Sequence, residues 1–274
     1  MSHYAARGIK DLRHLLKTMA EHDSGHPYDL LIVSNTDQCL LEAMPSHQIH
    51  HEVREVVQDA FRLTHAYNDG AQLLKPGMVK HLVRKNLGMN LGAWEFGWRS
   101  DHSHSSYLFV QDETFVKRSP WLLPFVIRFR SISDDKHKPI LLGESWNQRW
   151  DIGWDEIKNK PFNYPIKLSH SDNQLPLIRR SDYYKEQISM WKIRLPSAAG
   201  HLRSLILFTN RLTLDLINGI HIGKEKEQCI AAEMAISFSV IAHGGICSQV
   251  SERPFWYFGH SEWIKNQKIR PSYD

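Results

Sequence analysis

Short apolar runs alternate with segments of helical periodicity along the first half of this chain, and this alternation constrains its fold more than any other feature. Apolar residues recur every three to four positions in segments 9–21 and 49–67, and segment 121–132 is also expected to be helical. Between them lie runs of the kind that form buried strands, at residues 28–33, 79–83, 106–110 and 139–142. The alternation predicts an α/β fold with a mostly parallel sheet flanked by helices, which binds ligands at the carboxyl ends of its strands.

The second half of the chain has a different texture. Residues 151–194 are rich in Asn, Asp, Ser, Pro, Trp and Tyr and show weak periodicity, which predicts a loop-rich insertion with short elements. We expect a long amphipathic helix over residues 198–217 and another over 227–242, which Gly244 and Gly245 would end.

Composition narrows the classes of function. The 274 residues include 34 Lys and Arg against 30 Asp and Glu, without a dense basic block, so we expect no nucleic acid as partner. Three distant cysteines, Cys39, Cys229 and Cys247, indicate a reducing compartment, and no apolar run approaches the roughly 20 residues of a membrane span. The sequence therefore predicts a cytoplasmic protein. Its 17 scattered histidines form no cluster typical of a metal-dependent hydrolase.

The apolar run that starts at Ser106 ends in two adjacent acids, Asp112 and Glu113. Along the sequence, the nearest basic residue that follows them is Lys117. A divalent cation with oxygen ligands, magnesium or manganese, would relieve the repulsion between the two carboxylates and could hold a diphosphate. The alternative is a solvated turn that Asp112 caps.

A second segment, RKNLGMNLGAW, follows a predicted strand and precedes a predicted helix. Its small residues Gly88 and Gly92 would let a ligand approach the backbone, and Arg84 and Lys85 favour a negative group there. The G-x-x-x-G spacing matches neither the dinucleotide fingerprint nor the phosphate-binding loop.

Three segments in order, YDLLIVSN (28–35), LVRKNLGMNLGAW (82–94) and YLFVQDETF (107–115), resemble the nucleotide-sugar half of GT-A type glycosyltransferases. The likeness is to rhamnan-synthesis and related polysaccharide enzymes and covers roughly residues 9–145. It implies a GT-A fold with a nucleotide-sugar-binding half (1–145) and an acceptor-binding half (146–274). It also implies transfer of a hexosyl or deoxyhexosyl group from a nucleotide-diphosphate donor to a glycan or lipid-linked acceptor.

The resemblance also implies roles for single residues. The donor would be bound by Ser34, Asn35, Arg84, Asn86, Gly88, Asn90, Gly92, Gln111 and Asp112. Manganese or magnesium would be held by Asp112, Glu113 and the late histidine His260. Two positions depart from the family: Asn90 stands where Asp is usual, and Gln111, Asp112 and Glu113 replace a more acidic triplet.

For the acceptor side, the resemblance places the catalytic carboxylate at Glu233, which would deprotonate the acceptor hydroxyl. Asp172 and Glu144 are weaker alternatives. Glu233 could instead be a surface residue or the partner of an arginine, and His260 a packed histidine. Four tryptophans could stack on sugar rings or pack the core of the second half: Trp146, Trp150, Trp154 and Trp191.

Two further expectations remain open. The chain begins at Met1 to Tyr4, already at the end of the family's first strand, so either this strand is very short or the natural start lies upstream. The altered acidic triplet allows an alternative function, a catalytically inactive glycan-binding or assembly subunit. Lipid-linked acceptors would add peripheral association with the inner face of a membrane.

Overall fold

The computed structural model describes residues 1–62, 73–133, 138–147, 149–156 and 180–260. A parallel sheet in the order β1-β2-β3 opens the fold, formed by β1 (Ser2–Tyr4), β2 (Leu30–Thr36) and β3 (Val79–Lys85). Ser2 pairs with Val33, and Leu30 pairs with Val79. The strand β2, LLIVSNT, is buried at every position except the half-buried Leu31, because helices cover both sides of this sheet.

A second, mixed sheet has the order β4-β7-β6-β8. It comprises β4 (Ser106–Val110), β7 (Ile206–Asn210), β6 (Ile140–Gly143) and β8 (Ile246–Gln249). The strand β7 runs antiparallel to both β4 and β6, whereas β6 and β8 are parallel. A bridge between Ser2 and Gln111 joins β1 to the end of β4, so the two sheets meet along this seam.

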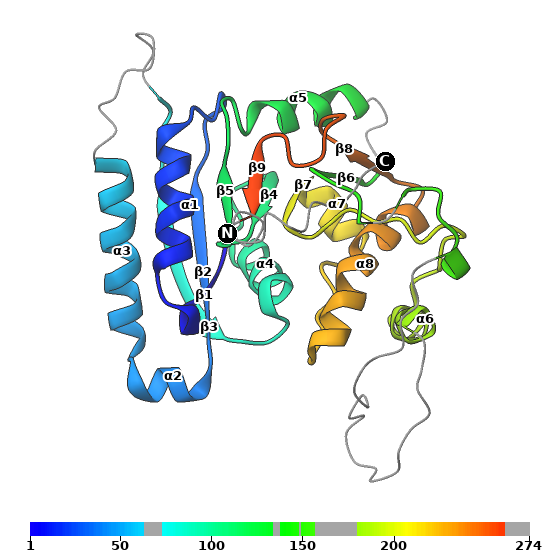
Figure 1. Ribbon diagram of the computed structural model, residues 1–274, viewed down its shortest axis with the longest axis horizontal. Coiled ribbons are helices and arrows are strands. Elements are labelled where there is room, and N and C mark those ends of the chain that lie inside the picture. The colour runs from blue at the N-terminus through cyan, green and yellow to red at the C-terminus, as the bar shows by residue number, and fades with distance from the viewer. Residues whose placement is uncertain (63–72, 134–137, 148, 157–179, 261–274) are drawn as a thin grey trace.

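Helices cover the two faces of the parallel sheet, as Figure 1 shows. On one face lie α1 (Lys10–Glu21) and α3 (Ser46–Arg62), and on the other lies α4 (Met89–Ser100). The apolar positions of α1 are buried because they recur at helical spacing, at Leu12, Leu15, Leu16 and Met19. The helix α5 (Leu123–Ile132) packs against β6.

The C-terminal half adds α6 (Arg180–Met190), α7 (Arg211–Leu216) and α8 (Lys226–Ala242). Most residues of α8 from Cys229 to Val240 are buried because α4, α6, β6 and β8 all pack against this helix. Short elements complete the chain: η1 (Ala5–Arg7), α2 (Gln38–Ala43), η2 (Trp154–Glu156) and a two-stranded sheet of β5 (Thr114–Val116) and β9 (Phe258–His260). Within the described ranges, no helix is both long and apolar enough to cross a membrane.

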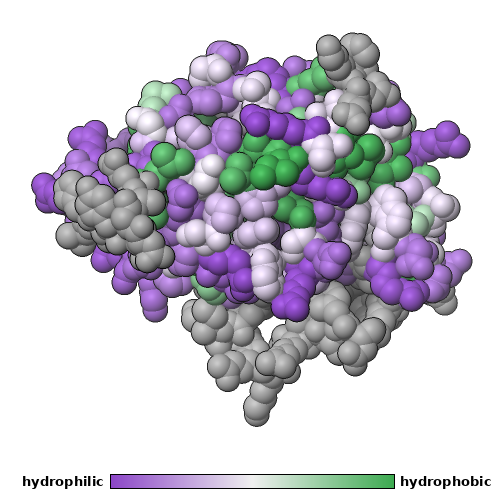
Figure 2. All heavy atoms as spheres, turned by 90° about the horizontal axis from the view of Figure 1, so that it is seen from above, coloured by the Kyte–Doolittle hydropathy of each residue, from purple (hydrophilic) through white to green (hydrophobic). Residues whose placement is uncertain are grey.

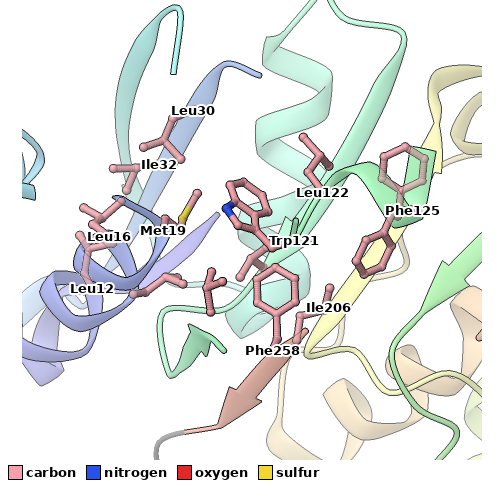
Figure 3. Packing of buried hydrophobic residues seen from close by; sticks show 14 of the residues in the cluster. Leu12, Leu16, Met19, Leu30, Ile32, Trp121, Leu122, Phe125, Ile206 and Phe258 are labelled. Atoms are coloured by element: carbon pink, nitrogen blue, oxygen red, sulfur yellow. The ribbon is translucent and has the colours of Figure 1, made fainter. Parts of the chain in front are cut away.

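Two large apolar clusters form the core. In the first, Trp121 and Phe125 pack with Phe258 and with the apolar face of α1, as Figure 3 shows. The second lies around α4, α7 and α8 and includes Trp94, Trp98 and Ile236. These two clusters hold the strands rigidly, so the polar residues at the strand ends have fixed positions.

The structure confirms the helices and strands expected in the first half as far as they are described, and also the helix over 227–242. The helix expected over 198–217 is wrong. The apolar run at Ile206 to Phe208 forms β7, a strand between β4 and β6 buried by both sheet neighbours, and only Arg211–Leu216 is helical. The insertion at 151–194 contains the helix α6, and residues 63–67 and 157–179 lie outside the described part of the chain.

Candidate functional site

Polar side chains meet at the carboxyl ends of β1, β2 and β3. The hydroxyl of Tyr4 donates a hydrogen bond to Asp37, and Asn86 Nδ2 donates to Asp37 Oδ1 over 3.4 Å. The other amide atom of Asn86, Oδ1, is buried without a protein partner in the structure. Buried polar atoms are nearly always paired, so this oxygen is a free acceptor at the predicted donor site.

Asn35 and Arg84 form a fixed pair beside this group. Arg84 Nη1 donates to Asn35 Oδ1 over 3.3 Å and to the carbonyl of Leu87 over 3.2 Å. Asn35 Nδ2 donates to the carbonyl of Met89 over 2.7 Å. The pair therefore ties the end of β2 to the start of α4. Burial lowers the pKa of Arg84.

Ser34 points away from this edge. Its hydroxyl lies 2.8 Å from His3 Nδ1 and 2.8 Å from His81 Nε2, and His81 Nδ1 lies 2.8 Å from His50 Nδ1. Burial, together with His50 and His3, lowers the pKa of His81 to about 3. The side chain of Ser34 thus belongs to a polar chain that runs through the parallel sheet to α3.

Two glycines of the segment RKNLGMNLGAW, Gly88 and Gly92, lie directly against other residues of this protein. Gly88 caps α4 with φ at 77°, and a Cβ there would lie 2.1 Å from Ile222 Cγ2. A Cβ on Gly92 would lie 1.8 Å from the carbonyl oxygen of Leu87. The space beside these glycines, which the sequence assigned to a ligand, is therefore occupied by Ile222 and by the carbonyl of Leu87.

Ser204 connects the two halves of the predicted site. Its carbonyl accepts hydrogen bonds from Asn90 Nδ2 over 3.3 Å and from Gln111 Nε2 over 2.8 Å. Its side chain hydrogen-bonds Glu233 on α8. Burial raises the pKa of Glu233 to about 7, against the opposing effects of Ser204 and Arg203. Ser204 thus connects Glu233 to Asn90 and Gln111, although these residues are far apart in the sequence.

The acidic pair that follows β4 has its positive partner elsewhere in the chain. Glu113 forms an ion pair with Arg7, and Asp112 Oδ2 accepts the backbone N–H of Tyr4 over 3.0 Å. Asp112 is buried, and burial raises its pKa while the nearby His3 opposes this shift. His260 pairs with Thr114 across β5 and β9, which places its Nε2 3.8 Å from Glu113 Oε2.

The three expected metal ligands have other partners in this arrangement. Among the described residues, no group of three or more His, Cys, Asp or Glu side chains is placed to hold a metal ion. Of the expected ligands, Asp112 is occupied by a backbone N–H, and Glu113 by a guanidinium group. A bound manganese or magnesium ion would require Arg7 to move, so metal binding stays a prediction.

The alternative bases and the tryptophans have other surroundings. Buried Glu144 accepts backbone N–H groups from Tyr257 and Phe258 and so anchors β9, and Asp172 lies outside the described residues. Trp154 packs on Phe238, and Trp191 stacks on His221. Trp150 is 47% exposed beside Trp146, so among the four it has the widest face for a sugar ring.

Comparisons with known proteins add little to this geometry. No family model matches the chain, and no curated protein does. The crystal structure of S. aureus TarS has 13% sequence identity and a TM-score of 0.41, over 94% of this chain and 35% of that chain. For the structure of S. aureus TarS 1–349, the identity and TM-score are the same, and the match covers 97% of this chain and 60% of that one.

This chain therefore spans less than two thirds of either TarS chain. At a TM-score below 0.5, the likeness carries no argument about function. The structure itself is a mixed α/β fold with a helix-covered parallel sheet.

Four residues of the site were not expected from the sequence: Tyr4, Arg7, Asp37 and Ser204. Asp37 had a usable signal because it directly follows the polar end of β2. Tyr4 had a similar signal, because it lies at the end of the first strand. Ser204 and Arg7 had none, since Ser204 contacts Asn90 and Gln111 through its carbonyl and Arg7 contacts a residue 106 positions away.

Proposed function

We propose that the chain is a glycosyltransferase that moves a hexosyl or deoxyhexosyl group from a nucleotide-diphosphate sugar to a glycan or lipid-linked acceptor. The observation that carries the proposal is the bridge through Ser204. It connects Glu233, the candidate base, to Asn90 and Gln111, two residues of the candidate donor site. A donor and an acceptor bound on the two sides of Ser204 would meet between these groups.

The proposed reaction uses Glu233 as general base. Its carboxylate takes the proton of an acceptor hydroxyl as the hydroxyl oxygen attacks the anomeric carbon of the donor. The bond from that carbon to the diphosphate oxygen breaks, and the nucleoside diphosphate leaves with the bonding electron pair. With a pKa near 7, about half of the Glu233 side chains are ionised at neutral pH, which suits a base that must both take and release a proton.

The leaving diphosphate needs positive charge nearby. Arg7 is exposed on η1, which directly follows β1, and it forms an ion pair with Glu113. We propose that Arg7 turns from Glu113 toward the diphosphate when the donor binds. Asn86, with its free oxygen, would accept a hydrogen bond from the base or ribose.

The test is release of nucleoside diphosphate from a panel of nucleotide sugars, with and without manganese. Glu233→Gln should lower turnover by about 100-fold or more, while donor binding measured by calorimetry stays unchanged. The matched control is Glu186→Gln, an exposed position on α6, which should retain full activity.

Wild-type turnover should rise with pH through about 7, since ionised Glu233 is the active form. Full activity of Glu233→Gln would contradict the proposed base.

One observation favours the second candidate, a glycan-binding or assembly subunit without chemistry. The ion pair between Arg7 and Glu113 occupies a carboxylate that the resemblance assigns to metal. This candidate predicts that nucleotide sugars bind, or fail to bind, without any turnover, and that Glu113→Ala leaves glycan binding and the cellular phenotype intact. Cytoplasmic location and association with a membrane surface stay predictions in both cases.

A further inference from the structure

Basic and aromatic side chains lie around the loop that joins β8 to β9. Arg253 and Trp256 belong to this loop, and Lys117 and Arg118 directly follow β5, the strand that pairs with β9. The N–H of Lys117 donates to the carbonyl of Tyr257 over 2.8 Å, so the two segments lie side by side. The loop lies in the upper part of Figure 1, and Figure 2 looks onto the molecule from that end. Hydrophilic residues cover most of that view, around a band of hydrophobic ones.

Two guanidinium groups lie over the ring of Trp256. Arg118 Cζ lies 3.5 Å from the centroid of this ring, and Arg253 Cζ lies 4.9 Å from it. The shorter distance is that of two flat groups in contact, so the guanidinium of Arg118 is stacked on the indole. A stacked guanidinium uses its face, whereas its N–H donors point outward in its own plane. The indole therefore fixes the position of Arg118 without occupying its donors.

These donors have no acceptor within the described residues. The guanidinium groups of Arg118 and Arg253 form no hydrogen bond and no ion pair in that part of the chain. The Nε atom of Arg118 is buried, although buried donors are nearly always paired. An unpaired buried donor lowers the stability of a protein, so an anion that accepts a hydrogen bond from this Nε would remove that cost.

Positive charge exceeds negative charge around this stack. Burial lowers the pKa of Lys117, and the like charge of Arg118 lowers it further. The carboxylate that acts on both cations is Glu144. Burial raises the pKa of Glu144 to about 7, against the opposing effect of two backbone N–H groups at the start of β9, so about half of these carboxyl groups are ionised at neutral pH. One partly ionised carboxylate does not balance the three cations Lys117, Arg118 and Arg253, the basic cluster of this loop.

The loop itself is fixed by several contacts. Phe255 is buried and lies in the left-handed region with φ at 52°, which is strained for an aromatic residue. Its N–H donates to the carbonyl of Glu144 over 3.2 Å, and its carbonyl accepts a hydrogen bond from Lys117 Nζ over 2.8 Å. Such strain persists only where surrounding contacts hold the backbone, and here the held backbone places the next residue, Trp256, against Arg118.

Arg203 connects this loop to the candidate base. Its Cζ lies 5.9 Å from the centroid of the Phe255 ring. Its charge lowers the pKa of Glu233, against the effect of burial, and it directly precedes Ser204, whose side chain hydrogen-bonds Glu233. The basic cluster is thus joined to Glu233 through Phe255 and Arg203.

We propose that the basic cluster binds a phosphate group of the acceptor, carried either within a glycan or next to its lipid. The edge of a guanidinium donates two parallel hydrogen bonds to phosphate oxygens, and the Nε of Arg118 would be one of these donors. Lys117 and Arg253 would balance the remaining charge of the phosphate. This inference rests on the proposed function for the identity of the acceptor, whereas phosphate binding by the cluster can be measured without any turnover.

Calorimetry with inorganic phosphate tests the site directly. Arg118→Gln and Arg118→Lys should each weaken phosphate binding by about tenfold or more, since lysine keeps the charge but has neither the Nε donor nor the flat guanidinium edge. Arg253→Gln, at an exposed position, should also weaken binding and replaces the Arg118 variants if these do not fold. The matched control is Arg54→Gln, at an exposed position on α3, which should bind phosphate as the wild type does.

Two results would overturn the proposal. The first is a wild-type chain that binds no inorganic phosphate. The second is wild-type affinity for phosphate in both Arg118→Gln and Arg253→Gln.

Nuclear magnetic resonance locates the bound anion. The indole N–H signal of Trp256, assigned by its loss in Trp256→Phe, should shift when inorganic phosphate is added, because the stacked Arg118 gains hydrogen bonds. The indole of Trp94, buried in the second apolar cluster, is the internal control and should not shift. A Trp256 shift that is unchanged in Arg118→Gln would mean that phosphate binds through other groups, against the proposed site.

Two further ligands identify the source of the phosphate. Glycerol 3-phosphate represents a phosphate ester within a glycan, and geranyl diphosphate represents the diphosphate of a lipid-linked saccharide. At least one of them should compete with inorganic phosphate and bind more weakly to Arg118→Gln, and the tighter of the two identifies the source. Failure of both to compete would overturn the proposal.

A nucleoside diphosphate separates this site from the donor site. Uridine diphosphate should bind together with inorganic phosphate, because the proposed donor lies on the other side of Ser204. Displacement of phosphate by uridine diphosphate would assign the basic cluster to the donor and overturn the inference. Glu233→Gln should lose turnover and still bind phosphate, so failure of the proposed transfer and failure of the phosphate site give different results.

Discussion

At the scale of single residues, the structure places the polar residues of the predicted donor site as expected but not the two glycines. The polar residues Asn35, Arg84 and Asn86 lie together at one sheet edge, as a parallel sheet requires of side chains at its strand ends. The glycines Gly88 and Gly92 instead fit against Ile222 and Leu87, which belong to the chain itself. A sequence shows that a position needs a small residue, but the structure shows what comes close to it.

Gly88→Ala should destabilise the protein by about 2–4 kcal/mol, from roughly 1 kcal/mol of strain at positive φ and the clash with Ile222. The matched control is Gly244→Ala, because Gly244 has φ at 71° and a Cβ added there would have nothing within 4 Å. In chemical denaturation, the free energy of unfolding of this control should fall only by the roughly 1 kcal/mol of backbone strain. Ile222→Ala should relieve the clash, so the double variant should be more stable than the sum of the two single effects, and strictly additive effects would contradict the clash.

At the scale of elements, the strand β7 shows the limit of periodicity. Its apolar residues Ile206 to Phe208 are compatible with a helix face or with a fully buried strand, and the length of a short run does not distinguish them. The strand is favoured over a helix because it pairs with β4 on one side and with β6 on the other. The helix α8 was recognisable because it is long and ends at glycine.

The strand β9 depends on one buried carboxylate, that of Glu144. Glu144→Ala would leave the N–H groups of Tyr257 and Phe258 unpaired, and we expect a loss of about 2–4 kcal/mol of unfolding free energy. Glu144→Gln keeps one acceptor oxygen and should lose about half as much. Urea titration measures both, with Glu186→Ala on the surface of α6 as the control. A loss below about 1 kcal/mol in Glu144→Ala would refute the anchoring role.

At the scale of the whole molecule, a charged cluster ties the two halves together at the starts of the strands. His104 lies 2.7 Å from Asp29, before β2, and 2.9 Å from Asp101, after α4. Arg211, in the C-terminal half, donates to the backbone carbonyls of Asp101 and His104. The boundary expected near residue 145 is therefore bridged on this side as well as through Ser204.

This cluster makes stability depend on pH. The hydrogen bonds that the His104 ring donates to Asp29 and to Asp101 raise the pKa of His104, against the opposing effect of burial. The contribution of His104 to stability is therefore complete below about pH 6.5, the value of the unfolded chain, and is lost as pH rises through the higher folded pKa. His104→Gln should flatten the fall in melting temperature over this window, whereas His102→Gln, at an exposed neighbour, should preserve it. If the melting temperature of His104→Gln falls with pH as steeply as that of the wild type, the cluster of His104, Asp29 and Asp101 is not the cause of the pH dependence.

The sequence by itself determined several local elements: an apolar period predicted α1, an apolar run predicted β2, and the polar residues that follow β2 and β3 marked one edge of the sheet. The tertiary structure alone decided the partners. Arg7 neutralises Glu113, His260 approaches Glu113 through β9, and Ser204 joins Glu233 to Gln111. Periodicity depends on neighbours three or four residues apart, whereas these contacts depend on how the sheets pack, and no local pattern encodes that.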